Sequence, residues 1–272
     1  LHRGRSKHVI AATSVLRKAI ELDRYCADAY AILGEAMVRK YLLWDGDVSF
    51  IEEARDTADK ALTLDNQRAL AHTALGFANH LSGHMDDAQR EYRLAMQCDQ
   101  NEWFAHRLLG SIYAREGNFK SATGLLQRAI GLMPSHIAPF DHLYNVLVRL
   151  DRYEEALEIA DKGIASAHRR LKEAPDDMDA RLHLAMLFAR IGRGEDARTE
   201  VDSALEAAPR DGFTCYHAAC ARALIADPDD LERAIELLLI ARGRGYYLRG
   251  ELTRNTDLDV LRSYPQFRDL ES

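Results

Sequence analysis

Apolar residues recur along this chain at a spacing of about 3.6, and no stretch alternates apolar and polar positions as a half-buried strand would. The segment LGSIYAREGNFKSATGLLQRAIGLMP shows the arrangement: two helical runs are separated by Gly117, and Pro134 closes the second. Small residues stand at fixed places in it, with Gly110 in the first run and Ala122 and Ala129 in the second. The pattern predicts an almost wholly helical chain built from pairs of short helices.

The arrangement repeats with a period of 34 residues. Leu75-Gly76 and Leu109-Gly110 share one register, and the alanines of the second run recur in step with them. With small offsets the register extends in both directions, so we expect 13 repeat helices, the first of them a leading helix without a partner, and a short helical tail. The expected repeats span residues 27–66, 67–100, 101–134, 135–175, 176–210 and 211–244 of an array at 1–248, and a helical cap follows at 249–272.

Close packing between two short helices explains the small residues. A glycine or alanine in the first helix of a repeat, helix A, lets the second helix, B, approach, and the alanines of B receive the next A helix. Three glycines are expected to end A helices in tight turns: Gly83, Gly117 and Gly192. Capping signals mark four helix starts at Ser49, Asn118, Asp151 and the pair Asp227-Pro228.

One departure from the period predicts a loop. Between Gly34 and Gly76 the spacing is 42 residues, and the surplus falls within YLLWDGDVSF. We expect an enlarged loop at Trp44, Asp45 and Gly46 that projects from the stack.

A second departure predicts a long helix. Between Ala156 and Ala197 the spacing is 41 residues, and apolar residues stay in step through the surplus. Because seven residues make about two helical turns, we expect one extended B helix that ends before Pro175.

These positions resemble the tetratricopeptide repeat, whose consensus falls at positions 4, 7, 8, 11, 20, 24, 27 and 32 of 34. The resemblance implies an all-α fold, a right-handed α-solenoid of helix-turn-helix repeats whose A helices line a concave groove. The segments AIELDRYCADAYAILGEA, YHAACARAL and NTDLDVLRSYPQF are similar to repeat regions that follow class III adenylate or guanylate cyclase domains, or Ser/Thr kinase domains, in bacterial signalling proteins. His217 stands where asparagine is usual there, and neither enzyme's catalytic residues are present.

Composition limits the function classes further. A formal net charge of −7 disfavours a nucleic-acid partner, which would need clustered cations. No apolar run approaches the roughly 18 residues of a membrane span. The four cysteines form no C-x-x-C pair, which favours a reducing, cytoplasmic location. The chain starts at Leu1 without a signal peptide, and we expect it to be a fragment of a longer protein.

Motifs for catalysis are absent. The sequence contains no G-x-x-x-x-G-K-[ST], G-x-S-x-G or H-E-x-x-H, so we expect no enzyme, no catalytic residue and no cofactor. Gly192-Arg193-Gly194 is interpreted as a helix-helix turn rather than a dinucleotide fingerprint. His80 and His84 are four apart but straddle a turn and have no third ligand, so we expect no metal site.

The groove remains as the candidate site. Positions 2, 5, 6, 9, 12 and 13 of the A helices are the ones that the resemblance places on the concave side. The candidate partner-binding residues are Phe77, Phe104, Arg107, Ser111, Arg115, Asp141, His142, Asn145, Arg149, His183, Met186, Arg190, Tyr216 and His217. The recurring arginines at position 13 also suit the last turn of a helix, where the macrodipole favours a cation. The Lys and Asn pair with which chaperone-binding members clamp a carboxylate is absent.

Three hypotheses follow. The first is a non-enzymatic scaffold that binds a protein, peptide or helix, with an acidic ligand favoured by the arginines; it is expected to be a regulatory part of a larger signalling protein. The second is self-association through an exposed array end or through the long fourth B helix. The third is a fragment of a nucleotide cyclase or kinase whose catalytic domain lies elsewhere.

Overall fold

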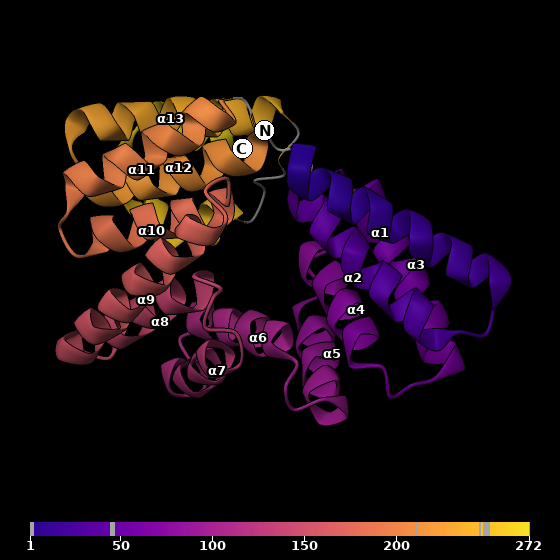
Figure 1. Cartoon of the computed structure of the whole chain (residues 1–272). Helices are drawn as coiled ribbons and strands as arrows, with labels where there is room; N and C mark the ends of the chain where they lie inside the picture. Colours follow the sequence, from indigo (N-terminus) through magenta and orange to yellow (C-terminus); the bar gives the residue numbers. More distant parts are fainter. Residues whose placement is uncertain (1–2, 44–46, 210, 245, 247–250, 272) are drawn as a thin grey trace. The chain divides into compact units, whose positions relative to one another are not determined.

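Short helices that pack in successive pairs make up this protein in the computed structural model, which describes residues 3–43, 47–209, 211–244, 246 and 251–271 (Figure 1). The leading helix is α1 (Arg3–Leu22). The pairs are α2 (Ala27–Leu43) and α3 (Ser49–Leu64), α4 (Ala69–Leu81) and α5 (Met85–Cys98), α6 (Trp103–Arg115) and α7 (Phe119–Leu132), α8 (Ala138–Arg149) and α9 (Tyr153–Glu173), α10 (Met178–Arg190) and α11 (Gly194–Ala207), and α12 (Gly212–Ile225) and α13 (Pro228–Gly243). The tail comprises α14 (Glu251–Arg254), the 3₁₀-helix η1 (Thr256–Ser263) and α15 (Pro265–Glu271).

The helical prediction is confirmed for this part of the chain. The described residues contain no strand, and α1–α13 are the 13 repeat helices that the apolar period predicts. The A helices are α2, α4, α6, α8, α10 and α12, and the B helices are α1 and the second member of each pair. Each pair lies within one of the six residue ranges expected for the repeats.

The helices fall into two compact units that meet in sequence at residues 133 and 134. The N-terminal unit holds α1–α7, and its core is built from α2 to α6, with residues such as Met37, Tyr92 and Leu109 fully buried. The C-terminal unit holds α8–α15, and a core cluster within it joins α10–α13 to the tail. Each unit therefore has apolar packing of its own.

Small residues bring the two helices of a pair together. A Cβ added to Gly76 on α4 would lie 2.7 Å from Cε1 of Tyr92 on α5, and one added to Gly110 on α6 would lie 3.0 Å from Cγ of Leu126 on α7. Ala88, one of the register alanines of the B helices, is fully buried. The recurring small residues are thus contact points, because a larger side chain would force the helices apart.

Residues in the left-handed conformation turn the chain between several A and B helices. Gly83, Gly117 and Gly192 have φ of 81°, 78° and 78°, which confirms the expected turns. In the turn between α8 and α9 the equivalent residue is Asp151, with φ of 58°. The expectation that Asp151 caps α9 is therefore wrong: the chain needs one more residue to leave the turn, and Arg152 is the N-cap.

Two of the other caps are confirmed and one is wrong. The side chain of Asn118 accepts a hydrogen bond from the α7 backbone. Asp227 holds the N-cap position of α13 with Pro228 at the first helical position, and its side chain makes no capping hydrogen bond. Ser49 is the first residue of α3 rather than its cap. Its N–H donates to Oδ1 of Asp47 (3.0 Å), because a short carboxylate side chain readily bonds a backbone N–H two residues on.

The two departures from the period are accommodated differently. Helix α9 has 21 residues and ends before Pro175, as predicted. The other surplus lengthens α2 to 17 residues, against 13 in α4, so part of the expected loop is helix. Trp44, Asp45 and Gly46 themselves lie outside the described residues.

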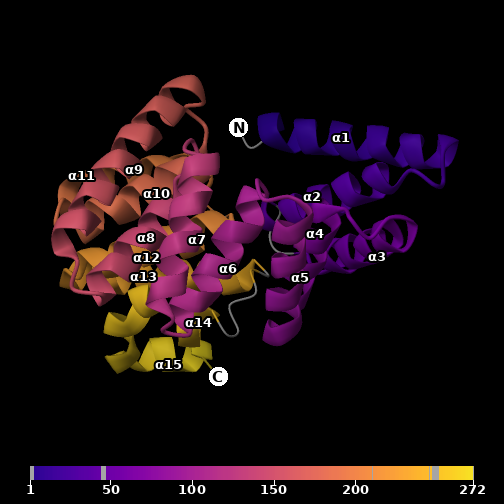
Figure 2. The ribbon, with the colours of Figure 1, turned by 90° about the horizontal axis from the view of Figure 1, so that it is seen from below.

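The tail lies against the last repeat helices (Figure 2). Helix η1 contacts α12, and α15 contacts α13. Five tail residues are buried in the same cluster as α12 and α13: Leu252, Leu258, Leu261, Phe267 and Leu270. Such burial is what an array requires of its last segment.

The packing account predicts opposite effects for two glycine replacements. Gly76→Ala should lower the free energy of unfolding by about 1–3 kcal/mol, because its Cβ meets the ring of Tyr92. Gly124→Ala on α7, where nothing lies within 4 Å of the added Cβ, should raise it by about 0.5–1 kcal/mol. Urea unfolding followed by circular dichroism measures both, and equal effects would contradict the account.

The tail predicts a second result. Deletion of the chain from Asn255 should lower the melting temperature and cause aggregation, because the side chains beneath Leu258 and Phe267 lose their cover. Differential scanning calorimetry and light scattering check this. A shortened chain that stays soluble and melts at the same temperature would show that the tail is not a cap.

Candidate partner-binding surfaces

Two aromatic rings and an adjacent arginine lie on the A-helix face of the N-terminal unit. Phe77 on α4 and Phe104 on α6 stack with ring centroids 6.3 Å apart and planes 25° apart. The guanidinium carbon of Arg107 lies 4.7 Å from the centroid of the Phe104 ring. Both rings are buried and Arg107 is half-buried. The Arg107 cation thus lies over the Phe104 ring, an arrangement that the quadrupole of the ring stabilises.

The polar edge of this face lies at the ends of the same two helices. Arg115, in the last turn of α6, is exposed, and its Nη2 lies 2.7 Å from Nε2 of His80 on α4. The hydroxyl of Ser111 donates to the carbonyl oxygen of Arg107 (3.0 Å) and is engaged within α6. The structure therefore brings the five candidates of this unit onto two neighbouring A helices.

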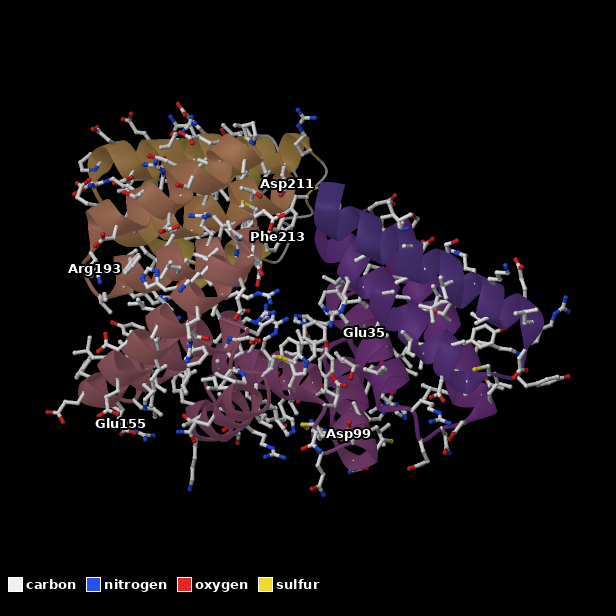
Figure 3. All side chains as sticks on the ribbon, viewed as in Figure 1. Glu35, Asp99, Glu155, Arg193, Asp211 and Phe213 are labelled. Atoms are coloured by element: carbon white, nitrogen blue, oxygen red, sulfur yellow. The ribbon has the colours of Figure 1, made fainter. Side chains whose placement is uncertain are left out.

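A buried glutamate at the start of α6 adds a titratable group that the sequence analysis missed. Glu102 is 7% exposed, and its carboxylate accepts a hydrogen bond from the N–H of Phe104 (3.2 Å). Burial, and then the negative charge of Glu35 on α2 (Figure 3), raise the pKa of Glu102 to about 7. An N-cap glutamate carries no sign of burial in the sequence, so only the fold identifies it.

In the C-terminal unit, an ion cluster joins three elements. Nε of Arg190 on α10 lies 2.5 Å from Oδ1 of Asp141 on α8, and Nη2 of Arg190 donates to both carboxylate oxygens of Asp257 on η1 (3.0 and 2.9 Å). The Arg190 and Asp141 side chains are 6% and 3% exposed. Tyr144 also donates to the carbonyl oxygen of Arg190 (3.0 Å). The guanidinium is thus held by carboxylates on two sides.

The electrostatics of this cluster follow from burial and proximity. Burial alone would raise the pKa of Asp141, but the charge of Arg190, together with the nearby His183 side chain, outweighs it and holds that pKa below its usual range. Burial and the nearby Asp141 carboxylate raise the pKa of Asp257, against the opposing effect of Arg190. The pKa of Arg190 is raised despite its burial, because both carboxylates favour the cation.

Three histidines form a row across successive A helices. They are His142 on α8, His183 on α10 and His217 on α12, which occupy equivalent positions of their repeats. Each stands two residues before the position that corresponds to Gly110 of the 101–134 repeat. Their ring centroids are 6.3 and 5.6 Å apart. The middle ring is buried, with Nδ1 3.6 Å from Oδ2 of Asp141. A periodic sequence position thus becomes a line of side chains on one face.

The tail reaches the same face through Asn255. Its Nδ2 donates to the hydroxyl of Tyr216 (2.9 Å) and to Sγ of Cys220 (3.3 Å), both on α12. Phe213, labelled in Figure 3, lies on the same helix with its ring 4.3 Å from that of His217. The C-terminal unit therefore places a segment of the chain itself on the A-helix face.

The remaining candidates of this unit differ in accessibility. Met186 is 3% exposed and belongs to the core cluster, whereas Asn145 is half-buried and Arg149 is exposed on α8. Sequence reasoning missed Asp257 as a partner of Arg190. Acidic residues inside an apolar tail were a signal, but nothing in the sequence indicated which arginine they meet.

Metal binding, disulfide bonds and membrane-spanning helices were also considered for the described part of the chain. No group of three or more His, Cys, Asp or Glu side chains there is arranged to hold a metal ion. His84 is the residue before α5 and makes no capping bond, and the four cysteines, all of them among the described residues, form no disulfide. No helix among these residues is both long enough and apolar enough to cross a bilayer.

Sequence comparison finds little. No family model matches the chain. A Haemophilus influenzae protein described as uncharacterized is 25% identical over 111 residues, a match that covers 39% of this chain. The matched part spans 62% of that relative's length.

Structural comparison establishes the fold. The chain is similar to a thermophilic TPR protein of Thermus thermophilus, with a TM-score of 0.51, 20% identity, and coverage of 72% of this chain and 98% of that one. It is also similar to a chain of the Cut9-Hcn1 hetero-tetramer of APC/C, with a TM-score of 0.61, 18% identity, and coverage of 95% of this chain and 47% of that one. The helix pairs are of the tetratricopeptide type.

The pKa of Glu102 predicts a pH-dependent stability. The pKa of Glu102 is about 7 in the folded protein, against 4.5 ordinarily. The free energy of unfolding should therefore fall as pH rises from about 4.5 to 7, and the loss should be complete above pH 7. Glu102→Gln keeps an acceptor for Phe104 but removes the charge. It should raise the free energy of unfolding by on the order of 2 kcal/mol at pH 8 and by far less at pH 4.5. Urea titrations at both pH values measure this, and equal gains would contradict it.

Proposed function

We propose that the protein is a non-enzymatic scaffold that binds a segment of another protein on its A-helix faces. The tetratricopeptide fold supports this, because stacked helix pairs present side chains from several A helices on one surface. The partner that suits these faces is an extended peptide or a helix with both acidic and apolar side chains.

One observation carries the proposal: the C-terminal unit already holds a short acidic segment on this face. The carboxylate of Asp257 accepts two hydrogen bonds from Arg190, and the amide of Asn255 donates to Tyr216. Leu258, next to Asp257, is fully buried. A carboxylate on an arginine, beside a buried apolar side chain, is the kind of contact that a partner segment would make.

The face of the N-terminal unit carries matching groups. Arg107 and Arg115 supply cations on α6, and Phe77 and Phe104 supply stacked rings beside them. We place one partner site on this face, and we assign Arg149, exposed at the end of α8, to the A-helix face of the C-terminal unit. Charge-assisted bonds to the two arginines give a partner orientation and affinity, and the Phe104 ring, already buried in the fold, supports Arg107 from below.

Charge reversal tests the proposal. Peptides selected from a random display library on the immobilised chain should be enriched in Asp or Glu next to apolar residues. Arg107→Glu with Arg149→Glu should weaken their binding by on the order of 1–3 kcal/mol, about 5- to 150-fold in Kd, in fluorescence polarisation. Helicity and melting should change little, since neither arginine is fully buried.

A matched control separates the site from net charge. Lys120→Glu with Arg169→Glu makes the same change of charge at exposed positions of the B helices α7 and α9. This double variant should bind the selected peptides as the original chain does. Unchanged binding in the Arg107 and Arg149 variant, or equal loss in both, would move the partner site away from the A helices.

A regulatory role in a larger signalling protein, and a cytoplasmic location, are the context that we propose for this scaffold. The similarity of YHAACARAL and NTDLDVLRSYPQF to repeat regions behind cyclase or kinase domains supports it. The coding sequence upstream of Leu1 tests it directly. A cyclase or kinase domain there would support this context, and an unrelated domain would remove it.

A further inference from the structure

His72 on α4 is bonded at both of its ring nitrogens inside the N-terminal unit. Nδ1 lies 2.7 Å from Oε2 of Glu91 on α5, and Nε2 lies 3.1 Å from the carbonyl oxygen of Asn66 in the turn before α4. His72 and Glu91 are 7% and 6% exposed. A carboxylate and a carbonyl are both acceptors, so the ring satisfies the two of them together only as the imidazolium, which carries a proton on each nitrogen.

The same bridge occurs in the C-terminal unit with a permanent cation. Arg181 on α10 occupies the position in its repeat that His72 occupies in its own. Its Nη1 lies 2.6 Å from Oε2 of Glu200 on α11, and its Nη2 donates to the carbonyl oxygen of Pro175 (3.0 Å). In both bridges the carbonyl stands six residues before the cation and the glutamate 19 residues after it. This position thus takes a cation that ties an A helix to its B helix and to the preceding turn.

His106 on α6 shows the arrangement without a carboxylate. It follows His72 by one repeat, and its Nε2 lies 3.1 Å from the carbonyl oxygen of Gln100, again six residues before. The residue 19 positions on is Leu125, which packs against the apolar core. Burial lowers the pKa of His106. Burial acts in the same direction on His72, but the hydrogen bonds to its two acceptors outweigh it and raise the pKa of that ring.

The other groups around the His72 bridge do not replace its carboxylate. Arg90 on α5 approaches the second oxygen of Glu91, with Nη2 3.3 Å from Oε1, and its side chain is 60% exposed. The other titratable groups near the bridge are Asp59 on α3, Asp65 in the turn before α4 and Cys98 at the end of α5. The printed bonds of the ring go to Glu91 and Asn66, so these two acceptors decide its charge.

We propose that His72 is a proton-dependent bridge: its imidazolium holds α4, α5 and the turn before α4 together, and loss of its proton loosens this helix pair. Because the pKa of His72 is raised in the fold, the stabilisation is fully present below the ordinary value of 6.5 and is lost as pH rises through the folded value. The bridge at Arg181 keeps its charge throughout this range.

The device goes beyond the proposed scaffold function and needs no partner. Helix α4 also carries Phe77, whose ring stacks on Phe104 of α6. The bridge therefore links proton binding to the order of the A-helix face in the N-terminal unit.

Hydrogen exchange followed by mass spectrometry tests the proposal in a Glu102→Gln background, which removes the titration of Glu102. After correction for the intrinsic effect of pH, the amides of α4 and α5 should exchange about 5- to 50-fold faster at pH 8 than at pH 6. His72→Gln should reduce this rise to less than about twofold. His106→Gln is the matched control, at the equivalent position of the next repeat, and should keep the rise. An equal rise with and without His72, or no rise in the background chain, would overturn the proposal.

Nuclear magnetic resonance of the imidazole nitrogens tests the bridge without replacing His72. The ring of His72 should titrate above 6.5 and above that of His106, with protons on both nitrogens at pH 6. Glu91→Gln should lower the pKa of His72, because the charge that opposes burial is removed. A His72 ring that titrates at or below the pKa of His106, or that is unaffected by Glu91→Gln, would show that the bridge is not held by its proton.

Discussion

The close approach of the two helices in a pair is the constraint on which the rest of this structure depends. It is set by residues without bulk, as where Gly76 meets the ring of Tyr92 and where Gly110 meets Leu126. Because a B helix also receives the next A helix within each unit, as α3 receives α4 and α11 receives α12, a small residue in one pair helps to set the orientation of the following pair. Stacking within a unit then places equivalent positions of its A helices on one face. The row formed by three histidines of the C-terminal unit is a direct result of that geometry.

A buried cation ties the tail of the C-terminal unit to its array. The guanidinium of Arg190 is stable inside the protein only because carboxylates neutralise it, and Asp141 alone comes from the repeats. Asp257 supplies the second carboxylate from the tail. Loss of one partner of such a cluster typically costs about 3–5 kcal/mol, so the tail is held by charge as well as by its buried leucines. In this unit, residues of the proposed partner-binding face also stabilise the fold.

The tail covers an apolar face of the C-terminal unit. The chain folds Leu258, Leu261 and Phe267 over its last repeat helices, where all three side chains are fully buried. On α1, in the N-terminal unit, Val15 and Leu22 are by contrast largely exposed.

The sequence by itself determined the helix pairs, the turns at glycine and the long α9, because these depend on residues close together in the chain. It also placed the candidate residues on the A helices, since a fixed period fixes the face. Only the tertiary structure decided that Arg190 meets Asp257, 67 residues away, and that burial beside Glu35 raises the pKa of Glu102. Those outcomes depend on burial and on charges distant in sequence, which act through space and leave no local pattern.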